Sequence, residues 1–444
     1  MRICEDILKV CIISDYLPGY HRIWSGAELI AVSLAEMLKA SQCEVFFVTV
    51  PFEITPSGSG EFEVFPVWTP LRRLGAIARN FPIDVIAVWQ IAGLLRKKKP
   101  DVVHINAKYL YLPAVLACSI LGIPVVFTVP DYFIICPTTF IRKPDGSACK
   151  TYHSADCFSC LSVLGDGALK KCAIMTPKFV AQRVLALRMR IFNRCNRKID
   201  HFIALSDCSR QRLVNYGIPD NKVSVVYHYK LTNIEADSQE IVSPSVVFAG
   251  WLSEENGVDI LVDAFLESLK AVPDAKLYLI GTGKEKFICR LKVRIAEHHA
   301  ETSVVFLGKK SNPQVLNAIS KCDSVVVAHQ WPKEFGPVIL LEALAMGKPV
   351  ITSKIGATEE YVRDGETGFL ISDHANPHAF SEKITFLLKD PRTARQMGRK
   401  GRQTAAFIFD GSAARKMINL YRMVTTQKRG IHSGCGDTVI KRSA

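Results

Sequence analysis

The chain has 444 residues, of which 48% are hydrophobic and 22% are charged. This length exceeds one ordinary hydrophobic core, so two domains are expected. The composition excludes an intrinsically disordered protein and favours a globular α/β protein. The formal net charge of +14 is not evenly spread along the chain.

The first half alternates short apolar strands with helices. We expect helices over residues 26–40 and 209–216, and strands over residues 8–14, 44–50, 102–105, 125–129 and 201–205. Such alternation indicates a parallel, doubly wound sheet, in which ligands bind at the carboxyl ends of the strands.

Two segments of the first half resemble, in length or position, a membrane span and a secretory signal. The uncharged run 110–130 has the length of a membrane span, but Pro113, Gly122 and Pro124 divide it, so we assign it to a protein core. Near the N-terminus, Glu5 and Asp6 follow Arg2 closely, and this pattern differs from a secretory signal.

The second half repeats the alternation. Strands are expected over residues 245–249, 276–280, 303–307, 324–328 and 349–352. A polar segment, residues 232–245, is the expected linker between a domain of residues 1–231 and one of residues 246–402. Further helices extend to residue 424, and we expect a disordered tail over 425–444, since it is rich in Gly, Ser and Lys.

Four of the 14 cysteines lie in a loop rich in Gly, Ser, Asp and Pro. A Cys-x2-Cys pair with two cysteines upstream resembles the ligand set of a structural zinc site, and His153 is a further candidate ligand. Reduced thiols without metal are the alternative, because the first spacing is irregular and scattered cysteines are typical of a reducing compartment. The candidate metal ligands are Cys136, Cys149, Cys157 and Cys160.

Residues 168–199 contain nine basic residues and no acidic one. Apolar residues alternate with these charges at helical spacing, which predicts a basic amphipathic helix over residues 170–198. A second basic patch comprises Arg72, Arg73, Arg79 and residues 96–99. These surfaces favour an anionic membrane surface as a partner, and a solvated helix is the alternative. Nucleic acid is not expected, because no nucleic-acid-binding motif occurs.

The segment 334–350, with the sequence EFGPVILLEALAMGKPV, is the most informative one in the chain. It predicts a loop, a helix, a tight turn and a buried strand. The helix start after Gly336 would offer unpaired N–H groups to an anion. Glu334 would lie in the loop and Glu342 about two turns into the helix, on the same side. Alternatively, one glutamate interacts with the helix dipole and the other is solvated.

This segment resembles the donor-site motif of the retaining GT-B glycosyltransferases of family 4. Other landmarks of that family occur in its order over about residues 8 to 425, among them Ser-Gly-Ala-Glu at 25–28 and Thr-Val-Pro-Asp-Tyr-Phe at 128–133. Further landmarks are Phe-Ala-Gly at 248–250, Gly-Thr-Gly at 281–283 and Asp-Gly-Glu-Thr-Gly-Phe at 364–369. The resemblance implies two doubly wound, Rossmann-like α/β domains facing across a cleft, with a last helix, residues 403–424, that returns to the first domain.

The resemblance also implies roles for single residues. Glu334 would bind the hydroxyl groups of the donor sugar near the reacting carbon, and Glu342 would accept from the nucleotide ribose. Asp131 would lie on the acceptor side. No cofactor would be required for transfer. The donor-binding residues would be Gly26, Gly250, Gly283, Lys284, Lys333, Phe335, Gly336, Pro337, Val338 and Glu342.

Four positions depart from the family pattern. Pro130 stands where a histidine is usual, Trp251 where a diphosphate-binding arginine is usual, and Asn256 where a lysine is usual. In addition, Phe335 and Gly336 lie one residue closer to Glu334 than usual, so that an alignment from Phe-Gly pairs Lys333 with the family's first glutamate. Lys284 or Lys333 would then supply the missing charge.

Three functions remain open at this point. We expect a glycosyltransferase that uses a nucleotide-diphosphate sugar and a lipid-linked or cell-surface glycan acceptor, located in the cytoplasm at the inner membrane face. The departures favour a second hypothesis, a non-catalytic sugar-nucleotide-binding or scaffolding relative. A sugar-nucleotide epimerase of the same two-domain shape is a third alternative.

Overall fold

The computed structural model describes most of the chain, and every structural statement below refers to that part. It comprises residues 7–22, 26–54, 61–70, 84–139, 141–145, 147, 149, 157–165, 170–171, 175–227, 244–331, 334–408 and 412–434. Contacts divide the chain into two compact units. Unit 1 comprises Met1–Leu205, Arg210–Tyr229 and Ala413–Ala444, and unit 2 comprises Ser206–Ser209 and Lys230–Ser412.

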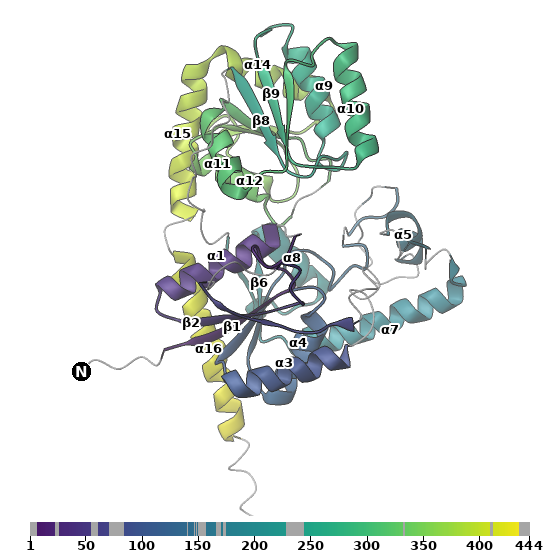
Figure 1. Cartoon of the computed structure of the whole chain (residues 1–444), viewed down its shortest axis with the longest axis vertical. Helices are drawn as coiled ribbons and strands as arrows, with labels where there is room; N and C mark the ends of the chain where they lie inside the picture. Colours follow the sequence, from purple (N-terminus) through teal and green to yellow (C-terminus); the bar gives the residue numbers. More distant parts are fainter. Residues whose placement is uncertain are drawn as a thin grey trace, which may run out of the picture. The chain divides into compact units, whose positions relative to one another are not determined.

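Unit 1 is built on a seven-stranded parallel sheet with the order β3-β2-β1-β4-β5-β6-β7 (Figure 1). Its strands are β1 (Lys9–Ser14), β2 (Glu44–Thr49), β3 (Glu63–Pro66), β4 (Val102–Asn106), β5 (Val125–Thr128), β6 (His201–Ala204) and β7 (Val223–Val225). Its helices are α1 (Gly26–Ala40), α3 (Val85–Lys98), α4 (Tyr111–Leu121), α5 (Cys157–Leu164), α7 (Lys178–Asn196), α8 (Asp207–Tyr216), whose first turn groups with unit 2, and α16 (Ser412–Gly434).

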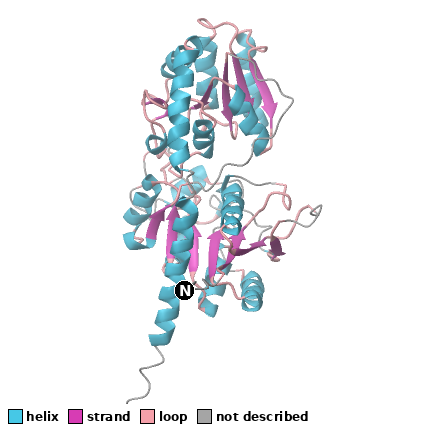
Figure 2. Ribbon diagram, turned by 90° about the vertical axis from the view of Figure 1, so that its left-hand side faces the viewer, coloured by secondary structure: helices cyan, strands magenta, loops and turns pink. Residues whose placement is uncertain are grey.

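Unit 2 is built on a six-stranded parallel sheet with the order β10-β9-β8-β11-β12-β13. Figure 2 distinguishes the strands (magenta) from the helices (cyan). Its strands are β8 (Ser245–Ala249), β9 (Lys276–Ile280), β10 (Val304–Gly308), β11 (Ser324–Val327), β12 (Val350–Ser353) and β13 (Gly368–Ile371). Its helices are α9 (Val258–Ser268), α10 (Glu285–Glu297), α11 (Asn312–Lys321), α12 (Val338–Ala345), α13 (Thr358–Tyr361), α14 (Pro377–Lys389) and α15 (Pro391–Ile408). The two parallel α/β sheets confirm the predicted fold class.

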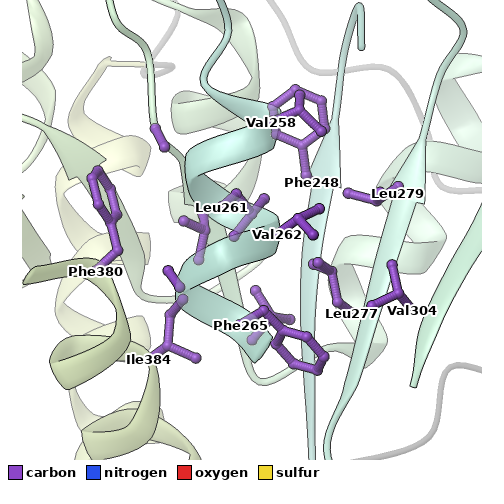
Figure 3. Packing of buried hydrophobic residues seen from close by; sticks show 14 of the residues in the cluster. Phe248, Val258, Leu261, Val262, Phe265, Leu277, Leu279, Val304, Phe380 and Ile384 are labelled. Atoms are coloured by element: carbon purple, nitrogen blue, oxygen red, sulfur yellow. The ribbon is translucent and has the colours of Figure 1, made fainter. Parts of the chain in front are cut away.

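The core of unit 2 shows how the hydrophobic pattern specifies the helix–sheet packing. Four residues of α9 recur at the i, i+3, i+4 and i+7 spacing of one helix face, and all are buried against the sheet residues Phe248, Leu277 and Leu279. Figure 3 shows these side chains, together with two residues of α14 on the other side of α9. The helix residues are Val258, Leu261, Val262, Phe265, Phe380 and Ile384.

The long basic helix differs from the sequence prediction at its start. The prediction was a continuous helix over residues 170–198, but α7 begins at Lys178 with Pro177 as its N-cap. Proline lacks the N–H that a helix interior requires, so it favours a helix start at this position. Arg72, Arg73 and Arg79 of the second basic patch lie outside the described residues.

The last helix also has other bounds than expected. The prediction was a helix over residues 403–424 followed by a tail, whereas α16 begins at Ser412 and continues to Gly434. Contacts with unit 1 extend beyond residue 424: Lys428 Nζ lies 2.9 Å from Asp200 Oδ1, and Arg429 Nη2 lies 2.8 Å from Asp101 Oδ1. These ion pairs favour helix in the segment that composition alone assigned to a tail. The predicted linker lies mostly outside the described residues.

Candidate functional site

The strand order of unit 2 places its ligand-binding edge. The sheet grows from β8 towards β9 and β10 in one direction, and from β11 towards β12 and β13 in the other. The carboxyl ends of β8 and β11 therefore form a switch point, where open α/β sheets bind ligands. The loops that leave these two strands touch. Gly257 has φ +64°, and a Cβ there would lie 1.7 Å from the carbonyl oxygen of Ala328.

Two predicted donor-binding glycines lie together at this edge. The N–H of Gly250 donates to Ile280 O over 2.9 Å, and the N–H of Leu252 donates to Thr282 O over 2.8 Å. A Cβ on Gly283 would lie 2.1 Å from Leu252 O, so only glycine permits this approach of the two loops. Lys284 follows directly as the exposed N-cap of α10.

The segment Glu334–Pro337 leads from β11 into α12. Glu334 is buried, and its carbonyl oxygen accepts a hydrogen bond from Ser206 Oγ. Gly336 has φ +67°, and a Cβ there would lie 2.2 Å from Tyr361 Oη. Pro337 is the N-cap of α12 and provides no side-chain hydrogen bond to the helix. The first N–H groups of α12, beginning at Val338, therefore have no side-chain cap and are suited to an anion.

Glu342 lies on α12 and is buried. Its Oε1 accepts a hydrogen bond from Asn312 Nδ2 over 2.7 Å. Burial raises the pKa of the Glu342 carboxyl, and the hydrogen bond from Asn312 opposes that rise. In the described part of the chain, Oε2 receives no hydrogen bond, which leaves it available to a hydroxyl donor. The alternative of a solvated Glu342 is thus wrong.

Two positions that depart from the family pattern are arranged around one turn. Trp251 follows Gly250, and 53% of its surface is exposed. Asn256 Nδ2 donates to the carbonyl oxygen of Trp251 over 2.7 Å. Asn256 therefore stabilises the turn that presents Trp251, and an exposed indole there offers a flat apolar surface to a ligand.

Unit 1 has a corresponding switch point between β1 and β4. Asp131 lies near this edge, after β5, and forms an ion pair with Lys108, which follows β4. The Asp131 carboxylate also accepts from the N–H of Phe133 over 3.0 Å. Gly26 begins α1 near the same edge, where Asn106 Nδ2 donates to Ala27 O over 2.7 Å.

Asp15 and Lys108 are residues of this edge that sequence reasoning missed. Asp15 follows β1 and is buried, and its carboxylate accepts from the N–H groups of Lys108, Tyr109 and Leu110 over 2.6, 2.9 and 3.1 Å. Burial raises the pKa of Asp15, and the three hydrogen bonds oppose that rise. Its position directly after the central strand was the available signal. The Asp15 carboxylate therefore positions the loop that carries Lys108.

The remaining candidates are less well placed. Lys333 lies outside the described residues, as does His153. Among residues that the structure describes, no group of three or more His, Cys, Asp or Glu side chains is arranged to hold a metal ion. Cys136 Sγ lies 3.2 Å from Thr138 Oγ1, and Cys160 Sγ donates to Arg142 O over 3.7 Å. The zinc site of Cys136, Cys149, Cys157 and Cys160 stays a prediction that metal analysis of the purified protein checks.

Models of known protein families match both units. Residues 24–228 match the model described as Glycosyltransferase Family 4, and residues 235–404 match the model described as Glycosyl transferases group 1. The chain belongs to the group 1 glycosyltransferases. The family prediction is thus confirmed.

Individual relatives of this glycosyltransferase are distant. The N-acetyl-alpha-D-glucosaminyl L-malate synthase of Bacillus anthracis is 26% identical over 281 residues, which cover 55% of this chain and 70% of that protein. An uncharacterized glycosyltransferase of Methanocaldococcus jannaschii is 32% identical over 160 residues, covering 35% of this chain and 42% of that protein.

Solved structures establish the architecture of the glycosyltransferase. The Anabaena protein HepE, crystallised with UDP, matches with a TM-score of 0.63 at 19% sequence identity, and the match covers 93% of this chain and 98% of that one. At this identity the likeness shows the fold, which is GT-B. No helix in the described residues combines the length and apolar character needed to cross a membrane.

Proposed function

We propose that this glycosyltransferase moves a hexose from a nucleotide-diphosphate sugar to an acceptor with retention of the anomeric configuration. One observation carries the proposal. Two buried carboxylates, Glu334 and Glu342, flank the start of α12, which has no side-chain cap, at the β8–β11 switch point. A structural neighbour from Anabaena was crystallised with UDP-glucose, which supports a nucleotide-sugar donor.

The chemistry explains why such a site needs these groups. As the bond between the anomeric carbon and the phosphate oxygen breaks, negative charge develops on the leaving diphosphate and positive charge on the sugar. In our proposal the first N–H groups of α12 stabilise the diphosphate. Glu342 Oε2 accepts from a ribose hydroxyl, because Oε1 is already held by Asn312. Glu334 binds the sugar hydroxyls near the reacting carbon.

Cationic side chains complete the proposed donor site. Trp251 and Asn256 replace the two usual cations, and charge-assisted hydrogen bonds contribute about 1.5–3 kcal/mol each. Two such losses correspond to about two to four orders of magnitude in rate. Lys284, exposed at the start of α10, and Lys333 are the residues that we expect to supply the charge. Trp251 would stack on a base or sugar face.

Asp131 is the proposed acceptor-side residue. Its ion pair with Lys108 and its hydrogen bond from Phe133 fix the carboxylate at the carboxyl edge of the unit 1 sheet. A carboxylate held in this way is suited to accept a hydrogen bond from an acceptor hydroxyl.

The enzymatic proposal is tested by nucleoside diphosphate release. Purified protein is incubated with a panel of nucleotide sugars, and Glu334→Ala is compared with Glu301→Ala, which removes an exposed carboxylate. We expect release with at least one donor, a loss of about a hundredfold or more in Glu334→Ala, and no change in Glu301→Ala. Binding of nucleotide sugars without any turnover would contradict the transferase proposal.

The same experiment addresses the alternative, a non-catalytic sugar-nucleotide-binding or scaffolding protein. The hydrogen bond from Asn256 to the Trp251 carbonyl oxygen favours this alternative. Both side chains are uncharged, so neither supplies a cation to a diphosphate. A scaffold would bind nucleotide sugars in both variants and would release no nucleoside diphosphate in either.

We further propose that the acceptor is lipid-linked or a cell-surface glycan, and that the protein binds the inner face of an anionic membrane. The exposed side of α7 carries three arginines, Arg183, Arg190 and Arg194, with Phe179 and Leu187, which are 63% and 56% exposed. Basic residues with exposed apolar side chains suit anionic headgroups. Arg188 does not belong to this surface, because it is buried against Phe133 O and the Phe192 ring.

Vesicle flotation tests the membrane proposal. The replacement of Arg183, Arg190 and Arg194 by Glu should abolish flotation with anionic vesicles at low salt. In the proposed bound state these side chains lie within a Debye length of the vesicle surface, so the negative charges of the variant would be repelled. The matched reversal of Lys270, Lys389 and Lys400, all exposed in unit 2, should leave flotation unchanged. Equal flotation of both variants would contradict the assignment of this face.

A further inference from the structure

Unit 1 exposes a group of large apolar side chains that belongs neither to the candidate donor site nor to α7. Trp89 of α3 is 74% exposed, and Trp68, which follows β3, is 58% exposed. Val85 and Ile86, in the first turn of α3, are also exposed. These four side chains are named the α3 patch. A group of large apolar side chains on the surface marks an interaction site, whereas scattered single ones do not.

Two hydrogen bonds hold Trp68 beside α3. The N–H of Trp68 donates to Gln90 Oε1 over 3.1 Å, and Gln90 Nε2 donates to Trp68 O over 3.2 Å. Gln90 is the neighbour of Trp89 in the second turn of α3. The backbone of Trp68 is thereby fixed to the part of the helix that carries the other three side chains, so the α3 patch is one surface.

The exposed face of α3 changes from apolar to basic along the helix. Trp89 and Arg96 are seven residues apart, so they lie on the same face, about 10 Å apart along the axis. Arg96 and Lys97 are exposed in the last turn, and α3 contains no acidic residue. Lys98 is paired with Glu63 over 2.6 Å, whereas Arg96 and Lys97 form no ion pair within the described residues. Two cations are therefore left for an anionic partner.

The composition of the α3 patch distinguishes between the partners that expose tryptophan to a ligand. Val85 lies one helical turn from Trp89, and neither Val85 nor Ile86 has a side-chain group that bonds to a sugar hydroxyl. A carbohydrate is therefore a poor partner. Indole rings with aliphatic side chains and nearby basic residues are typical of a helix that lies in the interface of an anionic bilayer.

The connections of the unit 1 sheet place α3 on the same side as α7. The crossovers from β3 to β4, from β4 to β5 and from β5 to β6 run in the same direction along the sheet, so right-handed connections put α3, α4 and α7 on one face. In agreement, α4 packs against both α3 and α7, and Figure 1 shows these three helices next to one another. One bilayer surface can therefore contact the outer sides of α3 and α7.

We propose that the α3 patch inserts into the interface of an anionic bilayer, with Arg96 and Lys97 at the level of the headgroups. This inference rests on the proposed membrane binding and assigns its apolar contact to α3. Stable attachment to a bilayer generally requires two contributions, such as an apolar insertion and a basic surface. In unit 1 the α3 patch supplies the first and the arginines of α7 supply the second.

Vesicle flotation of the full-length protein tests the insertion, with equal parts of phosphatidylglycerol and phosphatidylcholine at low salt. The double replacement Ile86→Gln with Trp89→Gln should lower the partition coefficient by about tenfold to a hundredfold, because two apolar side chains no longer leave water. The matched control is Val293→Gln with Phe386→Gln, which alters two exposed apolar side chains of unit 2 and should leave partitioning unchanged. Thermal melts ensure that only folded variants are compared.

Tryptophan fluorescence provides a second readout that a structural defect would not imitate. Lipids with brominated acyl chains quench a tryptophan that reaches the hydrocarbon boundary. Trp89→Phe keeps an apolar side chain and should still float, but the quenched fraction of the fluorescence should fall. Trp251→Phe removes an exposed tryptophan of unit 2, so the quenched fraction should not fall. Equal quenched fractions in these two variants would overturn the insertion of Trp89.

The outcomes separate this inference from the proposals on which it rests. If the α7 replacements abolish flotation while the Ile86 and Trp89 replacements behave like the control, the inference is overturned and the membrane proposal stands. If the wild-type protein does not float, both fail, and nucleoside diphosphate release still tests sugar transfer. A change of oligomeric state in sedimentation, without a change in flotation, would overturn the inference by making the α3 patch a contact between copies of this chain.

Discussion

At the scale of single residues, the carboxylate of Glu342 is buried in the candidate donor site. Burial raises its pKa, while Asn312 holds one of its oxygens. The folded state therefore binds the Glu342 proton more tightly than the unfolded state does. It follows that this group makes the protein less stable as the pH rises through the unfolded pKa towards the folded one.

Replacement of Glu342 by Gln tests this electrostatic cost. The amide oxygen still accepts from Asn312, but the side chain no longer ionises. Differential scanning fluorimetry measures the Tm of both proteins. We expect the Tm of the variant minus the Tm of the wild type to be more positive at pH 7 than at pH 4. A difference that becomes more negative as the pH rises would show that the folded protein stabilises the Glu342 carboxylate.

Gly336 provides a second prediction at this scale. An alanine there would adopt φ +67° and place its Cβ 2.2 Å from Tyr361 Oη. Gly365 is a matched control, since it has φ +72° and a Cβ added there would meet nothing within 4 Å. Both replacements incur the positive-φ cost of about 1–2 kcal/mol, and Gly336→Ala should lose more, because Tyr361 must move. Equal Tm values for the two variants would contradict the close packing of this turn.

At the scale of elements, α16 is held to unit 1 by a buried polar chain. Tyr421 Oη lies 2.7 Å from His104 Nδ1, and His104 Nε2 lies 2.8 Å from Thr128 Oγ1. Burial lowers the pKa of His104 to about 3, so the imidazole is neutral in the folded protein. The unfolded chain binds a proton on His104 more readily than the folded protein does. The contribution of the neutral imidazole to stability is therefore present above the unfolded pKa of His104 and is lost as the pH falls towards about 3.

Tyr421→Phe should reduce the free energy of unfolding by about 1–3 kcal/mol, because it leaves a buried nitrogen of His104 without its partner. Chemical denaturation at pH 7 measures this loss. Met423→Ala, which alters an exposed side chain two residues further along α16, should change the free energy by less than about 0.5 kcal/mol. A similar effect of both changes would contradict the role of the Tyr421–His104 pair.

Most of the elements follow from the sequence, whereas three of the four edge strands do not. The helix Gly26–Ala40 and the strands Ser245–Ala249 and Lys276–Ile280 have the predicted bounds, because each combines a clear apolar pattern with flanking turn residues. The strands Glu63–Pro66, Val223–Val225 and Gly368–Ile371 were not predicted. They are only three or four residues long, and their pairing with a neighbouring strand is a tertiary contribution that no local pattern records.

The candidate site also contains residues that the sequence predicts and residues that only the fold brings together. The loop and helix of segment 334–350 were predicted, because a motif and a helix-start signal coincide there. Asp15 was missed, since a single aspartate after a strand has many functions and its three N–H partners come from residues 108–110. Likewise, only the fold brings Asn312 to Glu342.

At the scale of the whole molecule, unit 1 is completed by the end of the chain. The helix α16 supplies Tyr421, Lys428 and Arg429 to residues of unit 1 that are more than 200 positions earlier in the sequence. We therefore expect that unit 1 completes its fold only when α16 is present.

Removal of residues 412–444 tests this dependence. We expect faster amide hydrogen exchange in β1 and β4 of the truncated protein, and unchanged exchange in β8 and β9, because α16 contributes no residue beyond Ser412 to unit 2. Mass-spectrometric exchange on peptides from each unit provides the measurement. Equal protection of β1 and β4 with and without α16 would show that unit 1 folds without it.

The proposed function depends on the binding of a nucleotide sugar at the carboxyl edge of the unit 2 sheet. A crystal structure of the protein with a bound nucleoside diphosphate tests this binding. We predict that the diphosphate lies at the first N–H groups of α12 and that a ribose hydroxyl donates to Glu342. A nucleotide bound elsewhere, with Glu342 and the start of α12 unoccupied, would contradict the claim.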